Sequence, residues 1–127
     1  MRALLDTSFF VATESGRPLA EMAGVTETEI SVVTLAELTV GVLMANDEDR
    51  PSRVATLTAV ESRWDPLPVD VEVARQFARI VAALRTAGHR VPILDALVAA
   101  TAAVEQIPVV TQDGDYEVIP GVEVIRV

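Results

Sequence analysis

Short apolar stretches alternate with helix-forming stretches along this chain, and this alternation restricts the fold more than any other feature of the sequence. Strands are expected at residues 3–5, 30–33, 66–69, 108–111 and 122–127, because these runs are dominated by apolar or β-branched residues. Strands that are separated by helices favour parallel pairing, with the helices packed on both faces of the sheet. The sequence therefore predicts an α/β fold with a central, mainly parallel sheet.

Helices are expected in the segments between the strands. Residues 72–87 carry Val73, Phe77, Ile80 and Leu84 at the spacing of an amphipathic helix, and Gly88 is expected to end that helix. The other expected elements are a helical turn at 9–12 capped by Thr7 or Ser8, a short helix at 17–23 with Pro18 in its first turn, a helix at 34–44 capped by Thr34, helices at 51–64 and 93–105, and a loop at 112–117.

The composition excludes several classes of site. The 127 residues indicate a single domain, 1–127. Cysteine and lysine are both absent, and a single histidine is present. This rules out disulfide frameworks, thiolate metal sites, phosphate-loop lysines and Schiff-base chemistry. The net charge of −9 favours a cation or a basic partner. Because Asp6 interrupts the first apolar run and no run approaches a membrane span, we expect a cytoplasmic protein without membrane contact.

Five acidic residues stand in or beside apolar segments, where a charge needs an explanation: Asp6, Glu37, Asp95, Asp113 and Asp115. Ligands of α/β proteins bind at the carboxyl ends of the strands, so these acids are expected to meet at one edge of the sheet. Several carboxylates in close proximity repel one another, and no arginine lies next to Asp6, Glu37 or Asp95 in the sequence. A hard divalent cation with oxygen ligands, such as Mg²⁺, is the expected solution.

Each of these acids also has a plain structural explanation. Asp6 could cap the helix that follows it, and Glu37 could complete a capping box with Thr34. Asp95 could favour the dipole of its helix, and the Asp113-Gly114-Asp115 segment could be ordinary turn chemistry. The metal interpretation rests on the expected joint placement of the acids, not on any one of them.

Four stretches of the sequence resemble PIN-domain ribonucleases, specifically the VapC-type toxins of bacterial toxin–antitoxin pairs. They are Leu4-Leu5-Asp6-Thr7-Ser8, the segment 30–38 with Glu37, the segment 94–102 with Asp95, and Val109-Val110-Thr111-Gln112-Asp113-Gly114-Asp115-Tyr116. The closing segment 119–124 is similar to the last strand of the family. The resemblance covers nearly the whole length, and it rests on the order and spacing of the motifs.

The resemblance implies an α/β/α sandwich and Mg²⁺- or Mn²⁺-dependent cleavage of RNA, which inhibits translation. It assigns the catalytic and metal-binding roles to Asp6, Glu37, Asp95 and Asp113, with Asp115 as second choice for the fourth acid. It implies supporting hydroxyls at Thr7, Ser8 and Thr111, a homodimer, and a cognate VapB-type antitoxin that inserts a basic or aromatic segment into the acidic site. Tyr116 stands where phenylalanine is commoner in the family.

One pair of arginines and two alternative functions complete the interpretation of the sequence. Arg75 and Arg79 lie four residues apart on one expected helix and could contact RNA phosphates, or simply form a solvated face. Two other functions remain possible: a catalytically inactive PIN-like binding partner, and an aspartyl phosphotransfer protein with Asp6 as acceptor. The second conflicts with the absence of lysine.

Overall fold

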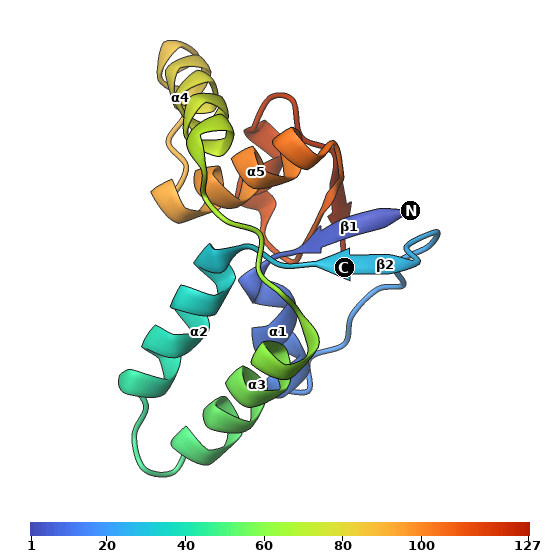
Figure 1. Cartoon of the computed structure of the whole chain (residues 1–127), viewed down its shortest axis with the longest axis vertical. Coiled ribbons are helices and arrows are strands. Elements are labelled where there is room, and N and C mark those ends of the chain that lie inside the picture. The colour runs from blue at the N-terminus through green and yellow to red at the C-terminus, as the bar shows by residue number, and fades with distance from the viewer.

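Four parallel strands form the centre of the molecule. The computed structural model describes residues 1–127. The sheet has the order β2-β1-β3-β4, and every neighbouring pair is parallel. The strands are β1 (Arg2–Leu5), β2 (Glu27–Glu29), β3 (Val109–Thr111) and β4 (Val124–Arg126). The predicted parallel sheet is confirmed, and the helices that connect its strands cover both faces (Figure 1).

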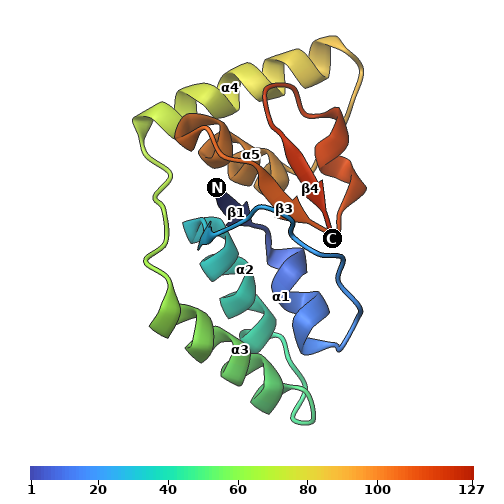
Figure 2. The same cartoon turned by 90° about the vertical axis from the view of Figure 1, so that its right-hand side faces the viewer.

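Five α-helices and one short 3₁₀ helix complete the fold. They are α1 (Thr7–Glu14), α2 (Val32–Leu43), α3 (Arg50–Arg63), α4 (Val71–Thr86), α5 (Ile93–Glu105) and η1 (Gly114–Val118). Helices α4 and α5 lie on one side of the sheet, and α1 and α3 lie on the other (Figures 1 and 2). None of the helices is both long and apolar enough to cross a membrane.

Two apolar cores result from the alternation of side chains along the strands. Leu4 and Val109 point into a core shared with α4 and α5. Leu5 and Val110, the next residues of the same strands, point into a second core shared with α1 and α3. Because both central strands are buried on both faces, consecutive residues on each are apolar, namely Ala3, Leu4 and Leu5 on β1 and Val109 and Val110 on β3.

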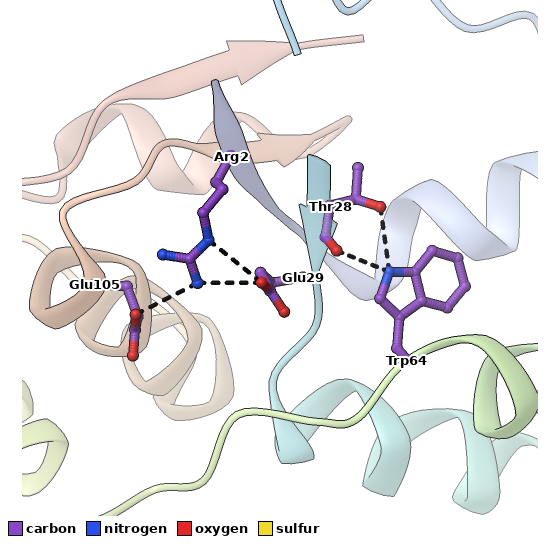
Figure 3. A network of polar contacts seen from close by, with 5 residues as sticks. All are labelled: Arg2, Thr28, Glu29, Trp64 and Glu105. Atoms are coloured by element: carbon purple, nitrogen blue, oxygen red, sulfur yellow. Dashed lines mark hydrogen bonds and ion pairs between the residues drawn. The ribbon is translucent and has the colours of Figure 1, made fainter. Parts of the chain in front are cut away.

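The edge strand β2 is fixed by side chains from distant parts of the chain. The guanidinium of Arg2 binds Glu29 at 3.1 Å and Glu105 at 3.5 Å. On the other side of β2, the indole nitrogen of Trp64 donates to the carbonyl oxygen of Thr28 at 3.0 Å (Figure 3). These contacts join β2 to β1, α5 and the end of α3, and so keep the start of α2 at the sheet edge.

Three predicted segments and the predicted helix caps are wrong. The expected strand at residues 30–33 is displaced to β2, because the buried Ser31 caps α2 through its side chain and Val32 already begins that helix. Residues 17–23 form no helix, and residues 66–69 contribute only an isolated bridge between Leu67 and Ser31. The caps also differ, since Asp6 caps α1 and Ser31 caps α2 in place of Thr7, Ser8 and Thr34.

Candidate metal centre

The acidic residues are brought together because β1 and β3 are adjacent and parallel. Leu5 pairs with Val110, so both strands end at the same edge of the sheet. Asp6 follows β1 directly, and Asp113 follows β3 by two residues. Asp95 lies in the first turn of α5 and Glu37 lies on α2, and both carboxyls are close enough to Asp6 for its charge to raise their pKa values.

Asp6 is the most deeply buried of the acids, with 4% of its surface exposed. Its Oδ2 accepts hydrogen bonds from the Thr111 hydroxyl at 3.0 Å and from the Ser8 amide at 3.4 Å. Its Oδ1 accepts one from the Tyr116 hydroxyl at 2.9 Å. Three neutral donors therefore fix the orientation of this carboxylate, while none of them cancels its charge.

A chain of hydroxyl groups connects Asp6 to the loop after β3. The single proton of Thr111 is donated to Asp6, so the Ser8 hydroxyl, 3.1 Å away, must donate to Thr111. Thr111 also accepts from the amide of Asp113 at 2.9 Å, and Ser8 accepts from the amide of Gln112 at 3.0 Å. This network holds the Asp113 loop against the start of α1.

Glu37 is positioned by the first residue of α1. The Thr7 hydroxyl donates to Glu37 Oε1 at 2.8 Å and lies 3.1 Å from the hydroxyl of Thr34. Partial burial raises the pKa of Glu37, the Thr7 hydrogen bond opposes this increase, and the charge of Asp6 adds to it. Glu37 therefore belongs to the acidic cluster and forms no capping box with Thr34, since Ser31 is the cap of α2.

Asp95 lies at the centre of the cluster. Oxygens of Asp95, Asp113 and Asp115 all lie within 4.8 Å of one another. Burial, followed by the charges of Asp6, Asp113, Glu37 and Asp115, raises the pKa of Asp95 to about 7. The Asp115 amide donates to Asp113 Oδ1 at 2.9 Å, and this hydrogen bond keeps the two loop acids close together beside Asp95.

No arginine neutralises this cluster. The ion pairs of the molecule join Arg2 to Glu29 and Glu105, Arg50 to Asp47, and Arg126 to Glu117. The donor set is thus oxygen-only, negatively charged and held by hydroxyl groups. Oxygen ligands with negative charge are what Mg²⁺ and Mn²⁺ prefer, so the residues present fit a divalent cation.

The structure places all five predicted acids at this edge, together with Thr7, Ser8 and Thr111. Asp6 caps α1 and also faces the cluster, so its two interpretations are compatible. Arg75 and Arg79 are exposed on α4, where Arg79 donates to Gln76 and neither forms an ion pair with the acids.

Sequence reasoning missed the contribution of Tyr116. Its ring is fully buried, and its hydroxyl lies 2.9 Å from Asp6 Oδ1 and 3.5 Å from Asp95 Oδ1. Burial and the charges of Asp6 and Asp95 raise its pKa well above the usual range, so the hydroxyl stays protonated and donates. A tyrosine that follows two acids in a short loop was the available signal, because a buried phenol needs a hydrogen-bond partner.

Comparison with known proteins agrees with this geometry. Residues 3–122 match the model of the PIN domain. Ribonuclease VapC5 of Mycobacterium tuberculosis is 48% identical over 128 residues, covering 98% of this chain and 94% of the relative. Ribonuclease VapC4 of the same organism is 41% identical over 126 residues, covering 99% and 97%.

A solved structure with the same fold is that of VapBC-5 from Mycobacterium tuberculosis, a member of the VapBC family of toxin–antitoxin systems. It superposes with a TM-score of 0.89 at 42% identity, covering 99% of this chain and 98% of the other. With the sheet order, the acidic edge and these matches in agreement, the chain belongs to the PIN-domain family and, within it, to the VapC ribonucleases.

Proposed function

We propose that this protein is a Mg²⁺- or Mn²⁺-dependent endoribonuclease and the toxin of a type II toxin–antitoxin pair. The observation that carries the proposal is the meeting of acids from four separate segments at one sheet edge, without a neutralising arginine. Relatives that are named ribonucleases align with the chain over nearly its whole length, which supports the same activity here.

The divalent cation would be held by Asp6, Glu37, Asp95 and Asp113, with Asp115 as the alternative fourth ligand. When bound, such an ion polarises phosphodiester oxygens and lowers the pKa of an attacking water. Thr7 fixes Glu37, while Ser8 and Thr111 fix Asp6 and the Asp113 loop. Because the pKa of Asp95 is about 7, occupation of the centre at neutral pH requires this carboxyl to lose a proton.

The RNA strand would be bound in part by arginine side chains. Arg75 and Arg79 are exposed one turn apart on α4, without an ion-pair partner. We assign them to RNA phosphates, where each contact would release condensed cations and make binding sensitive to salt.

The proposed biological partner is a VapB-type antitoxin, and the proposed assembly is a homodimer. Solved relatives include VapBC complexes. An acidic edge on a chain of net charge −9 would attract a basic antitoxin segment, which would compete with both the metal and RNA. Released from this partner, the nuclease would inhibit translation by cutting RNA.

Metal-dependent cleavage of total bacterial RNA by the purified protein tests the proposal. We expect cleavage with Mg²⁺ or Mn²⁺, none with a chelator, and a loss of at least about 100-fold in Asp6→Asn and Asp95→Asn, as expected when a ligand of an essential ion is removed. Asp65→Asn, an exposed acid away from the cluster, is the matched control and should retain activity.

Two results would contradict the proposed function. If the two cluster variants cut RNA as fast as the wild type, the acids are not the catalytic centre. If no RNA is cut and calorimetry detects no Mn²⁺ binding, the chain is an inactive PIN-like binding partner instead.

A further inference from the structure

Positive charge is concentrated in one part of this acidic protein. Residues 73–94, which include most of α4 and the loop to α5, contain Arg75, Arg79, Arg85, His89 and Arg90 and no acidic residue, whereas the chain has a net charge of −9. None of these four arginines forms an ion pair. This segment is therefore a free basic surface, and it ends directly before Asp95 of the acidic cluster.

A cavity of about 530 Å³ lies within the basic segment. It is bounded by the last turn of α4, the connecting loop and the first turn of α5. Its polar wall contains Arg85, His89 and Arg90, and its apolar wall includes Val81, Ile93 and Ala96. A cavity that combines cationic and apolar walls in this way suits a group with a charged end and a flat apolar body.

The turn after α4 builds this cavity. Gly88 adopts a left-handed conformation, with φ of 76°. The amide of His89 donates to the Leu84 carbonyl at 2.9 Å, and the amide of Gly88 donates to the Arg85 carbonyl at 3.1 Å. This is the Schellman arrangement, which reverses the chain tightly. It brings His89 and Arg90 back to the same cavity as Arg85.

The cavity and the acidic cluster share the first turn of α5. Ile93 and Ala96 line the cavity, and Asp95, between them in sequence, belongs to the cluster. Helix α4 lies along α5 over this region (Figure 2). An RNA strand whose scissile phosphate lay at the acids could thus place a neighbouring nucleotide in the cavity.

We propose that this α4–α5 cavity is a nucleotide subsite, in which Arg85 and Arg90 bind a phosphate of the RNA strand and Val81 and Ile93 contact the attached base. The inference rests on the proposed ribonuclease function, and it adds a position for substrate beside the cleavage site. It also explains how a chain with a net charge of −9 binds a polyanion, since attraction is confined to one acid-free segment.

The first test measures the subsite without cleavage. Adenosine 5′-monophosphate and inorganic phosphate are titrated separately into metal-free protein, and backbone amide signals are followed by NMR. We expect shifts at residues 88–91, saturating at lower concentration for the nucleotide, and their loss in the double variant Arg85→Gln/Arg90→Gln. The matched control Arg17→Gln removes one exposed arginine outside the segment and should retain them.

The second test uses RNA cleavage with metal. A contact remote from the reacting atoms stabilises the bound substrate and the transition state equally. The double variant should therefore raise KM by roughly tenfold or more and leave kcat within about twofold. The slope of binding against salt should also fall by about 0.7, the value for one lost phosphate contact on a single strand.

The outcomes separate this inference from the proposed function. If no RNA is cut, the ribonuclease proposal fails, while the NMR titration still decides whether the cavity binds a nucleotide. Absence of shifts at residues 88–91 overturns the subsite. So does equal binding of nucleotide and phosphate with an unchanged KM, which would indicate an adventitious anion only. A changed oligomeric state in the double variant with unchanged KM would identify the cavity as a contact between copies of the chain, and would equally overturn it.

Discussion

Tyr116 differs from the other residues of the acidic cluster, because it is the only neutral side chain that reaches two of the acids. Its hydroxyl donates to Asp6 Oδ1 at 2.9 Å and lies 3.5 Å from Asp95 Oδ1. Asp6 comes from the end of β1 and Asp95 from α5, so the phenol joins two elements of the centre. We regard Tyr116 as a positioning residue that orients the Asp6 carboxylate.

Replacing Tyr116 by phenylalanine should weaken metal binding and leave the fold intact. The ring still fills the core, whereas Asp6 Oδ1 loses a donor. Outer hydrogen-bond partners of metal ligands typically contribute 10- to 100-fold in affinity, and we expect about tenfold weaker Mn²⁺ binding by calorimetry. Unchanged Mn²⁺ affinity, with the same circular dichroism spectrum as the wild type, would contradict the positioning role.

Asp95 makes the stability of the metal-free protein depend on pH. Its pKa is about 7 in the folded state against an ordinary value of 3.8. Between these values the folded protein binds more protons than the unfolded chain, so the contribution of Asp95 to stability falls as pH rises from about 4 to about 7 and then stays low. Above pH 7 the charged Asp95 is a source of repulsion within the fold.

Asp95→Asn should therefore raise the melting temperature of metal-free protein at pH 8, with a smaller difference from the wild type at pH 5. Thermal unfolding in the presence of a chelator at both values of pH measures this. Asp65→Asn, the exposed control, should show no such dependence. A variant that is less stable than the wild type at pH 8 would show that Asp95 is not destabilised by its neighbours.

At the level of elements, the periodicity of apolar residues predicted those helices and strands whose whole length packs against the core. Helices α3, α4 and α5 and strands β1, β3 and β4 all lie within a few residues of the expected positions. The helix over 72–87 is an instance: Val73, Ile80 and Leu84 are buried in the core shared with α5. The spacing of apolar residues predicts such a helix because it indicates which face of the segment is buried.

The wrong predictions concern segments whose structure is set by a local hydrogen bond or by packing against the rest of the fold. Residues 30–33 are β-branched and apolar except for Ser31, which is buried. Its side chain accepts from the Val33 amide at 3.0 Å and so starts a helix there. Residues 17–23 have a proline at the start of a predicted helix but form an exposed connection with little packing. An isolated helix of seven residues cannot form without tertiary contacts.

Ser31→Ala tests the cap that replaced the expected one. The hydroxyl is fully buried and satisfies the amide of Val33, so its loss should lower the free energy of unfolding by about 1–2 kcal/mol. Denaturant unfolding measures this change. Ser62→Ala is the matched control, because the Ser62 hydroxyl is exposed on α3, and its change should stay within about 0.5 kcal/mol. Equal effects of both substitutions would remove the special role of Ser31.

On the scale of the whole molecule, the acidic site could be predicted because parallel topology brings strand ends together. Asp6 and Asp113 are 107 positions apart in the numbering, yet they lie at adjacent strand ends. The hydroxyl network and the Tyr116 contact could not be predicted, since they depend on side-chain directions and loop conformations. The α4–α5 cavity likewise depends on how Gly88 reverses the chain.

The net charge of −9 and the un-neutralised cluster together predict that divalent ions stabilise the fold. A ligand that binds only the folded state adds about 2.7 kcal/mol at 100 times its Kd, which should raise the melting temperature by several degrees for a chain of this size. Scanning calorimetry with Mn²⁺ measures this shift. NaCl at equal ionic strength is the control, because general screening acts on all the acids and should produce a smaller increase. The increase caused by Mn²⁺ should also shrink in Asp6→Asn and Asp95→Asn. If NaCl matched Mn²⁺ in both the wild type and these variants, the cations would be acting on the overall charge and not at the centre formed by the strand ends.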